Sequence, residues 1–203
     1  MPEKKLVERF SSSQQKKEKI MQNRNSEKSK VAVLVDHENL FLGKKNYIND
    51  CRKEIKKLPY ISYDIYDLMV KIRIYGNIIF KKLFIPHKHL NKPATMNDMA
   101  EFDKYGFIIQ TNPDYYTCNK NTRNIDEYIK KDAKFLIDNV EKLKVLIIVS
   151  DDGDFFSLAQ DAIDKGIKVI FFEIYKMNHL VLNDPNIEVE KVNFLKKYYS
   201  VSA

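Results

Sequence analysis

Five short apolar segments dominate the chain after residue 30. They are rich in valine, isoleucine and phenylalanine, and they comprise Val31–Val35, Ile78–Ile85, Phe107–Ile109, Val145–Val149 and Lys168–Phe172. Most are continuously apolar rather than alternating, which is typical of strands buried on both faces. This pattern predicts a mainly parallel β-sheet with helices on both of its faces.

Amphipathic stretches separate the apolar segments. Their apolar residues recur at helical spacing and predict helices over residues 62–74, 95–104, 125–140 and 155–163. Gly166 follows the last of these and suits the C′ position of a helix. Residues 189–199 are expected to be the end of a strand and a short C-terminal helix. Strands that alternate with helices in this way predict a doubly wound α/β fold.

The chain divides into a polar arm and one globular region. Its 203 residues are enough for a domain with a full hydrophobic core, which we place at residues 31–203. Residues 1–30 contain nine Lys/Arg and four Glu, so this segment carries +5 of the net charge of +7. We expect a flexible basic N-terminal arm, either a solvated tail or a non-specific RNA tether. The nearly balanced remainder weakens any argument from total charge.

The same sequence argues for a cytoplasmic location. It contains no run of about 18 apolar residues, so no membrane-spanning helix is expected, and residues 1–30 lack the apolar segment of a signal peptide. Cys51 and Cys118 have no CxxC spacing and suggest neither a zinc knuckle nor a disulfide scaffold. A reducing compartment fits this usage.

Acidic residues follow three of the predicted strands. Asp36 and Asn39 come after the first strand, Asp126 lies where a helix begins after the third, and Asp152 and Asp154 come after the fourth. Ligands bind at the carboxyl ends of the strands in open parallel sheets. We therefore expect these five side chains to converge at one edge of the sheet.

Such a cluster suits a divalent cation. Carboxylates in one crevice repel one another unless a cation lies between them, and Mg²⁺ or Mn²⁺ prefers oxygen ligands while keeping several waters. With the ion, the site can activate water and stabilise charge on a phosphate oxygen. Asn39 can orient a water or a phosphate without adding charge.

Simpler interpretations of these acids remain open. Asp36 can be a turn former, Asp126 can cap its own helix, and either Asp152 or Asp154 can cap the next helix. Each of these roles is structural and needs no metal.

Three neighbouring residues are weaker candidates for the site. Asp132 follows Asp126 by six helical residues, which is a rise of roughly 9 Å and a rotation of about 240°, so both cannot point into one crevice. Asp151 can simply face solvent. His37 is expected to be exposed beside Asp36, where it can act as a base or be incidental.

The order of four motifs resembles a known family. These motifs are Val-Ala-Val-Leu-Val-Asp36-His-Glu-Asn39, the helix-start Asp126, Ile-Val-Ser150-Asp-Asp152-Gly-Asp154-Phe155, and Lys165-Gly166-Ile-Lys-Val. Together they resemble the NYN domain, in the LabA-like branch of the PIN-like superfamily, over about residues 31–172. Two departures are Asp151, where the family usually has glycine, and Arg123-Asn124-Ile125, where it usually has Lys-Gly and a small apolar residue.

The resemblance implies a PIN-like sheet of strand order 3-2-1-4-5 and a Mg²⁺- or Mn²⁺-dependent ribonuclease. Carried over by position, the metal ligands are Asp36, Asp126, Asp152 and Asp154, and Asn39 joins them as a catalytic residue. PIN-like domains often pair, so a homodimer is expected by analogy.

Two functions compete at this point. The first is hydrolysis of RNA, with Lys120, Arg123, Tyr115 and Tyr116 of a polar loop binding the substrate backbone and stacking a base. The second is a non-catalytic RNA- or protein-binding module on the same fold. The basic stretch Asn46–Tyr63 is interpreted as a solvated helix and, secondarily, as an RNA contact. Neither a GxGxxG nor a GxxxxGK[ST] motif occurs, which disfavours dinucleotide and P-loop sites.

Overall fold

The computed structural model describes residues 29–54, 60–111 and 125–197. Nearly all of the expected N-terminal arm, and all four loop residues assigned to substrate binding (Tyr115, Tyr116, Lys120 and Arg123), lie outside these residues. Within the described ranges, no helix combines the length and the apolar character needed to cross a membrane.

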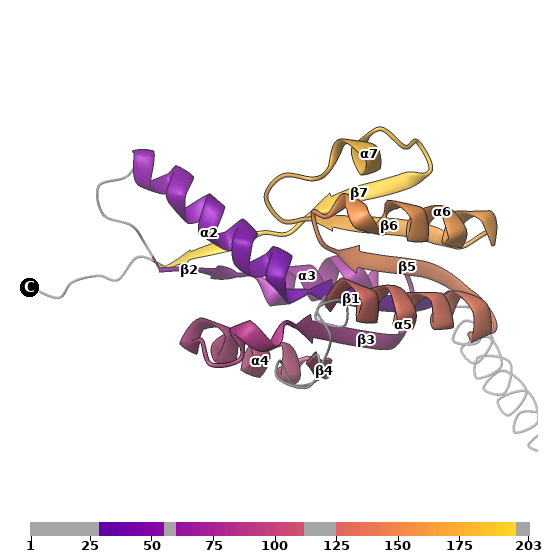
Figure 1. The fold of residues 1–203 in the computed structure, drawn as a ribbon, viewed down its shortest axis with the longest axis horizontal. Coiled ribbons are helices and arrows are strands. Elements are labelled where there is room, and N and C mark those ends of the chain that lie inside the picture. Colours follow the sequence, from indigo (N-terminus) through magenta and orange to yellow (C-terminus); the bar gives the residue numbers. More distant parts are fainter. Residues whose placement is uncertain (1–28, 55–59, 112–124, 198–203) are drawn as a thin grey trace, which may run out of the picture.

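A six-stranded parallel sheet forms the centre of the molecule (Figure 1). Its strands are β1 (Lys30–Asp36), β3 (Asn77–Ile85), β4 (Ile108–Thr111), β5 (Leu143–Val149), β6 (Lys168–Glu173) and β7 (Ile187–Lys191). The order is β4-β3-β1-β5-β6-β7, and every neighbouring pair is parallel. The predicted order is confirmed for the five strands foreseen, and β7 adds a sixth beside β6.

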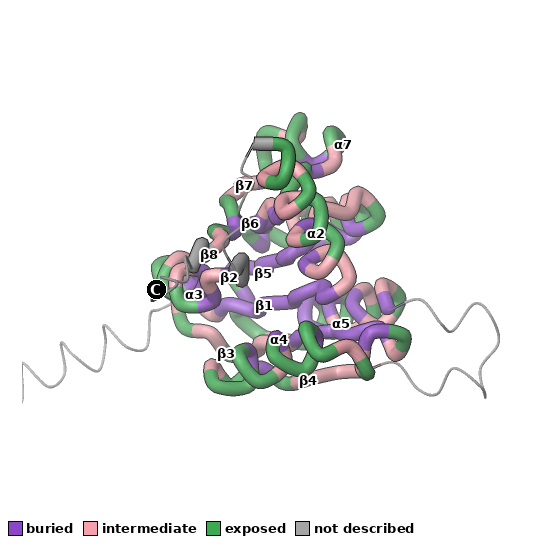
Figure 2. Tube along the Cα trace, turned by 90° about the vertical axis from the view of Figure 1, so that its left-hand side faces the viewer, coloured by how far each residue is buried: buried purple, intermediate pink, exposed green. Residues whose placement is uncertain are grey.

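Helices cover both faces of this sheet, as predicted. The helices α3 (Ile65–Arg73) and α4 (Pro93–Lys104) pack on one face, and α5 (Ile125–Asn139) and α6 (Phe156–Asp164) pack on the other. Figure 2 shows the result as a buried centre around β1 and β5 with exposed helical surfaces outside it. Alternate residues of β1 therefore enter two separate cores, which explains its continuous apolar sequence.

The stripe predicted along α5 is the face that it buries. Ile125, Ile129, Ala133 and Leu136 are all buried against the sheet. Burial of each large apolar side chain stabilises the fold by about 1.5–3 kcal/mol. This packing fixes the orientation of α5, and with it the position of its first turn.

Two parts of the chain depart from the prediction. The strand end expected from residue 189 is the end of β7, but up to residue 197, where the described part ends, no helix follows it: the chain forms β8 (Phe194–Lys197), which pairs antiparallel with β2 (Tyr60–Tyr63). The segment after Asp36 begins a long helix, α2 (His37–Glu54), which extends away from the sheet (Figure 1). The basic stretch predicted as a solvated helix is thus partly the outer half of α2.

Candidate metal centre at the carboxyl ends of β1 and β5

Asp36 is a buried carboxylate at the last position of β1. Its side chain is 1% exposed. Oδ1 accepts hydrogen bonds from the backbone N–H groups of Glu38 (2.9 Å) and Asn39 (3.3 Å), and Oδ2 accepts one from Asn39 Nδ2 (2.6 Å). The carboxylate therefore caps the first turn of α2 and holds the Asn39 amide.

Ser150 connects this carboxylate to the neighbouring strand. Because β1 and β5 are paired neighbours, the residues that follow them lie side by side. The buried Ser150 hydroxyl donates to Asp36 Oδ2 (3.2 Å) and accepts from the backbone N–H of Asp152 (3.2 Å). The sequence motif around Asp152 contains Ser150, but no role was predicted for its hydroxyl.

Three further carboxylates converge beside this pair. We call Asp126, Asp152 and Asp154 the acidic cluster: each offers one oxygen, and the three oxygens lie within 4.8 Å of one another. Asp126 lies in the first turn of α5, where the helix dipole favours a negative charge. Asp152 caps the 3-10 helix η3 (Gly153–Phe155), because its Oδ1 accepts the backbone N–H of Asp154 (2.9 Å). Its capping role, foreseen as an alternative, thus coexists with its place in the cluster.

Burial dominates the electrostatics of Asp36. It raises the pKa of this carboxyl group to about 7, and the negative charge of Asp126 adds to the shift, while the hydrogen bonds from Asn39 and Glu38 oppose it. The influence of Asp126 connects Asp36 to the acidic cluster, although Asp36 does not share the 4.8 Å spacing of its three members.

Asp151 supports the loop that carries the cluster. Its carboxylate accepts the backbone N–H groups of Ile174 (2.7 Å), Tyr175 (2.9 Å) and Lys176 (3.0 Å). The suggestion that Asp151 simply faces solvent is therefore wrong. An acid at the position where the family usually has glycine anchors the segment after β6 to the end of β5.

Gly153 makes a second close contact with the same region. A methyl group added at its Cα would overlap the side-chain amide of Asn178. Asn178 in turn caps the short helix α7 (His179–Leu182) by accepting the Leu180 N–H (2.9 Å). The 151–154 loop is thus held by the hydrogen bonds of Asp151 and by the packing of Gly153 against Asn178.

The two weaker candidates on other elements are engaged elsewhere. Asp132 forms an ion pair with Lys82 of β3 and is not a member of the acidic cluster, as its rotation from Asp126 predicted. His37 is fully buried, so the expectation that it is exposed is wrong. Its Nε2 lies 3.2 Å from Oδ2 of Asp98 on α4, which ties the beginning of α2 to α4.

The acidic cluster fits a hard divalent cation. Three atoms within 4.8 Å of one another share a point no more than about 2.8 Å from each, whereas Mg²⁺ and Ca²⁺ bind oxygens at roughly 2.0–2.6 Å. Shifts of each carboxylate oxygen by less than about 1 Å would bring all three within bonding distance of one ion. Two members are half-buried and Asp154 is exposed, so solvent can reach the site from outside.

Comparison with known proteins adds a family and a fold. The model of the NYN domain matches residues 30–183, which include every residue of the acidic cluster. A protein of unknown function from Vibrio parahaemolyticus has a crystal structure with the same fold, at a TM-score of 0.58 and 18% sequence identity, covering 82% of this chain and 94% of that one. None of the curated proteins matches this chain.

Proposed function

The chain belongs to the NYN domain family, and from that premise we propose that it is a metal-dependent ribonuclease whose acidic cluster hydrolyses RNA phosphodiester bonds. The observation that carries the proposal is the convergence of Asp126, Asp152 and Asp154 from two separate parts of the chain. Mutually repelling carboxylates held this close have a clear physical use when a divalent cation binds between them.

Each acidic residue has a distinct role in this proposal. Asp126 and Asp152 hold Mg²⁺ or Mn²⁺, and the exposed Asp154 completes the site and accepts a hydrogen bond from the attacking water. Asp36 and Asn39 fix the adjoining turn, and the Ser150 hydroxyl transmits that position to the backbone of Asp152. Asp36 also remains a proposed metal ligand.

The reaction consumes one water molecule per bond. The water oxygen forms a new bond to phosphorus, the bond to the leaving ribose oxygen breaks, and the proton released from water ends on that oxygen. When bound, the ion supplies Lewis-acid stabilisation of charge on the phosphate and lowers the pKa of a bound water. The remaining work, which is to orient the water and the phosphate, falls to Asp154 and Asn39.

A cleavage assay tests this proposal. Wild-type protein should cut a labelled single-stranded RNA in Mn²⁺ and lose that activity in EDTA, and Asp152→Asn should reduce the rate by at least about 100-fold. Asp161→Asn, an exposed acid of α6 outside the cluster, is the matched control and should cut like wild type. Mn²⁺ should also raise the melting temperature of wild type more than that of Asp152→Asn.

Two outcomes would count against the proposal. Equal cleavage by wild type and Asp152→Asn would place the reaction elsewhere. Absence of cleavage by wild type, together with tight binding of RNA, would favour the non-catalytic binding module.

A further inference from the structure

A groove with a basic rim lies between α2 and α4. It has a volume of about 290 Å³, and its walls include Phe41, Lys44, Lys45, Ile48 and Arg52 of α2 and Asp98 of α4. The α2 residues recur at spacings of three or four, so they share one face of that helix. Aliphatic and aromatic side chains therefore lie between cationic groups along one continuous surface.

The charge of this groove is almost entirely positive. Among the residues that the structure describes, Lys45 and Arg52 form no ion pair, and Lys44 lies 5.1 Å from the ring of Tyr63. Asp98, the acidic residue of the wall, is buried and already paired with His37. Three cationic side chains against one buried acid make the groove suited to an anionic occupant.

Phe41 offers a ring at the end of the groove nearest β1. The Lys92 ammonium group lies 4.3 Å from the centroid of this ring, and the ring centroids of His89 and His37 lie 4.8 Å and 6.3 Å from it. The ring is only half-buried and also belongs to the groove wall. An aromatic face beside cations is the combination that binds single-stranded nucleic acid, through base stacking and contacts to the backbone.

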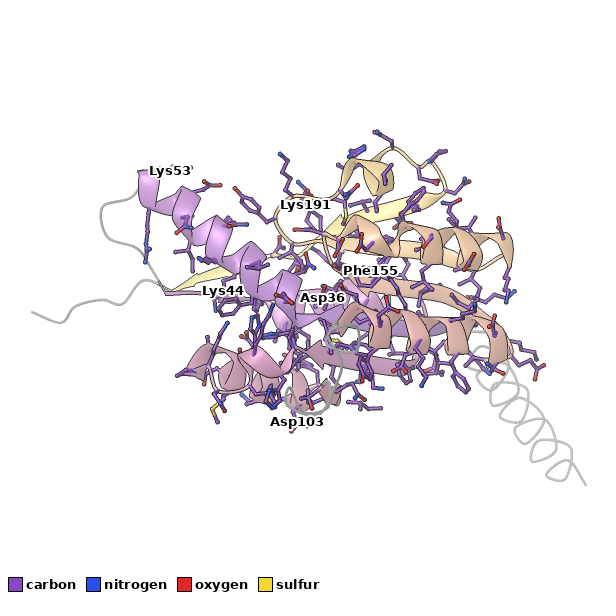
Figure 3. The ribbon with its side chains drawn as sticks, in the orientation of Figure 1. Asp36, Lys44, Lys53, Asp103, Phe155 and Lys191 are labelled. Carbon is purple, nitrogen blue, oxygen red and sulfur yellow. The ribbon has the colours of Figure 1, made fainter. Side chains whose placement is uncertain are left out.

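The groove runs along the helix that begins at the candidate metal centre. Helix α2 begins directly after Asp36, so Phe41 lies about 7 Å further along the helix axis and Arg52 about 24 Å further. Figure 3 shows this succession, with Asp36 at the beginning of α2, Lys44 part-way along it and Lys53 at its outer end. An RNA strand that follows α2 outward from this end would therefore meet the groove residues in turn.

We infer that the α2–α4 groove holds the single-stranded part of the RNA next to the cleaved bond, with a base against Phe41 and phosphates at Lys45 and Arg52. This inference rests on the proposed function, because it assigns the substrate of the same site. The small volume of the groove suits an unpaired strand, because duplex RNA is instead recognised by its shape across wide grooves.

Binding without cleavage tests the groove by itself. Fluorescence anisotropy with a labelled 12-nucleotide single-stranded RNA in EDTA should show the double variant Lys45→Glu/Arg52→Glu binding at least 10-fold more weakly than wild type. The association constant falls as salt rises, with a slope of about −0.7 per phosphate contact when both are plotted as logarithms. Replacing both cations by glutamine removes two contacts and should make this slope less steep by about 1.4. Phe41→Leu keeps an apolar side chain and should weaken binding by about 5- to 150-fold.

A charge-matched control separates the groove from general electrostatics. Lys134 and Lys144 are exposed on α5 and at the amino end of β5, and Lys134→Glu/Lys144→Glu changes the net charge by the same amount. Binding by this control should stay within about twofold of wild type. Equal weakening in both double variants, or no weakening in the groove variants, would overturn the inference, as would the same loss measured with a blunt RNA duplex.

The two proposals fail in different ways. Groove-dependent binding in EDTA with no cleavage in Mn²⁺ would support the groove and reject the ribonuclease. Cleavage that needs Asp152 but is unchanged in the groove variants, with unchanged binding, would support the ribonuclease and reject the groove.

Discussion

Replacing Asp36 by asparagine should remove a pH dependence from the stability of the fold. The folded protein holds a proton on Asp36 up to a pKa of about 7, whereas in the unfolded chain this group ionises near 3.8. Between these values the folded state binds more protons, so the free energy of unfolding falls as pH rises through that range. An asparagine side chain does not titrate, and the Asp36→Asn variant should therefore lack this contribution.

The magnitude follows from the difference between the two pKa values. Each pKa unit corresponds to about 1.4 kcal/mol. Between pH 5 and pH 8 the free energy of unfolding of the wild type should therefore fall by about 2.5 kcal/mol through this group, whereas that of Asp36→Asn should not. Urea unfolding followed by circular dichroism, in EDTA at each pH unit from 5 to 8, measures both proteins. Asp161→Asn should follow the wild type. Parallel curves for wild type and Asp36→Asn would refute the argument that burial controls this carboxyl group.

Two further predictions concern the loop that carries the cluster. Asp151→Ala removes the acceptor of three backbone N–H groups and should lower the free energy of unfolding by about 1–3 kcal/mol. Urea titrations measure this change, and an unchanged midpoint would show that water replaces the carboxylate without cost. Gly153→Ala should displace the Asn178 side chain from the amino end of α7, which it caps, and should lower the free energy of unfolding by about 1 kcal/mol. The same change should slow RNA cleavage. A melting temperature and a cleavage rate equal to those of wild type would contradict the close packing of Gly153 against Asn178.

The central strands could be predicted because a continuous apolar sequence directly indicates burial on both faces of the sheet. Val31–Val35 is apolar at every position, and both faces of β1 are indeed buried. The stripe on α5 is equally local, since residues three and four apart share a face. The sheet order was correct for the five strands that the family resemblance supplied. Of β7 only the end was expected, from residue 189, because residues 187–191 alternate glutamate with apolar residues and lack the continuous apolar sequence of the central strands.

The features that escaped prediction depend on distant partners. β2 and β8 are four residues each, and neither is stable without the other. The burial of His37 depends on Asp98, which no local pattern connects to it. For the site, strand-end reasoning anticipated that Asp126, Asp152 and Asp154 converge. The hydrogen bonds that the Asp36 carboxylate accepts from the backbone of Glu38, from Asn39 and from Ser150 could not be predicted, because they depend on the geometry of one loop.

The pairing of β2 with β8 has a consequence for the order in which the chain assembles. Tyr63 pairs with Phe194, so β2 leaves the ribosome long before the segment that completes it. Closing a loop of that length is entropically costly and slows the step that depends on it. During synthesis, β2 must therefore wait with an open edge while β1, β3 and β5 assemble, until β8 emerges and pairs with it.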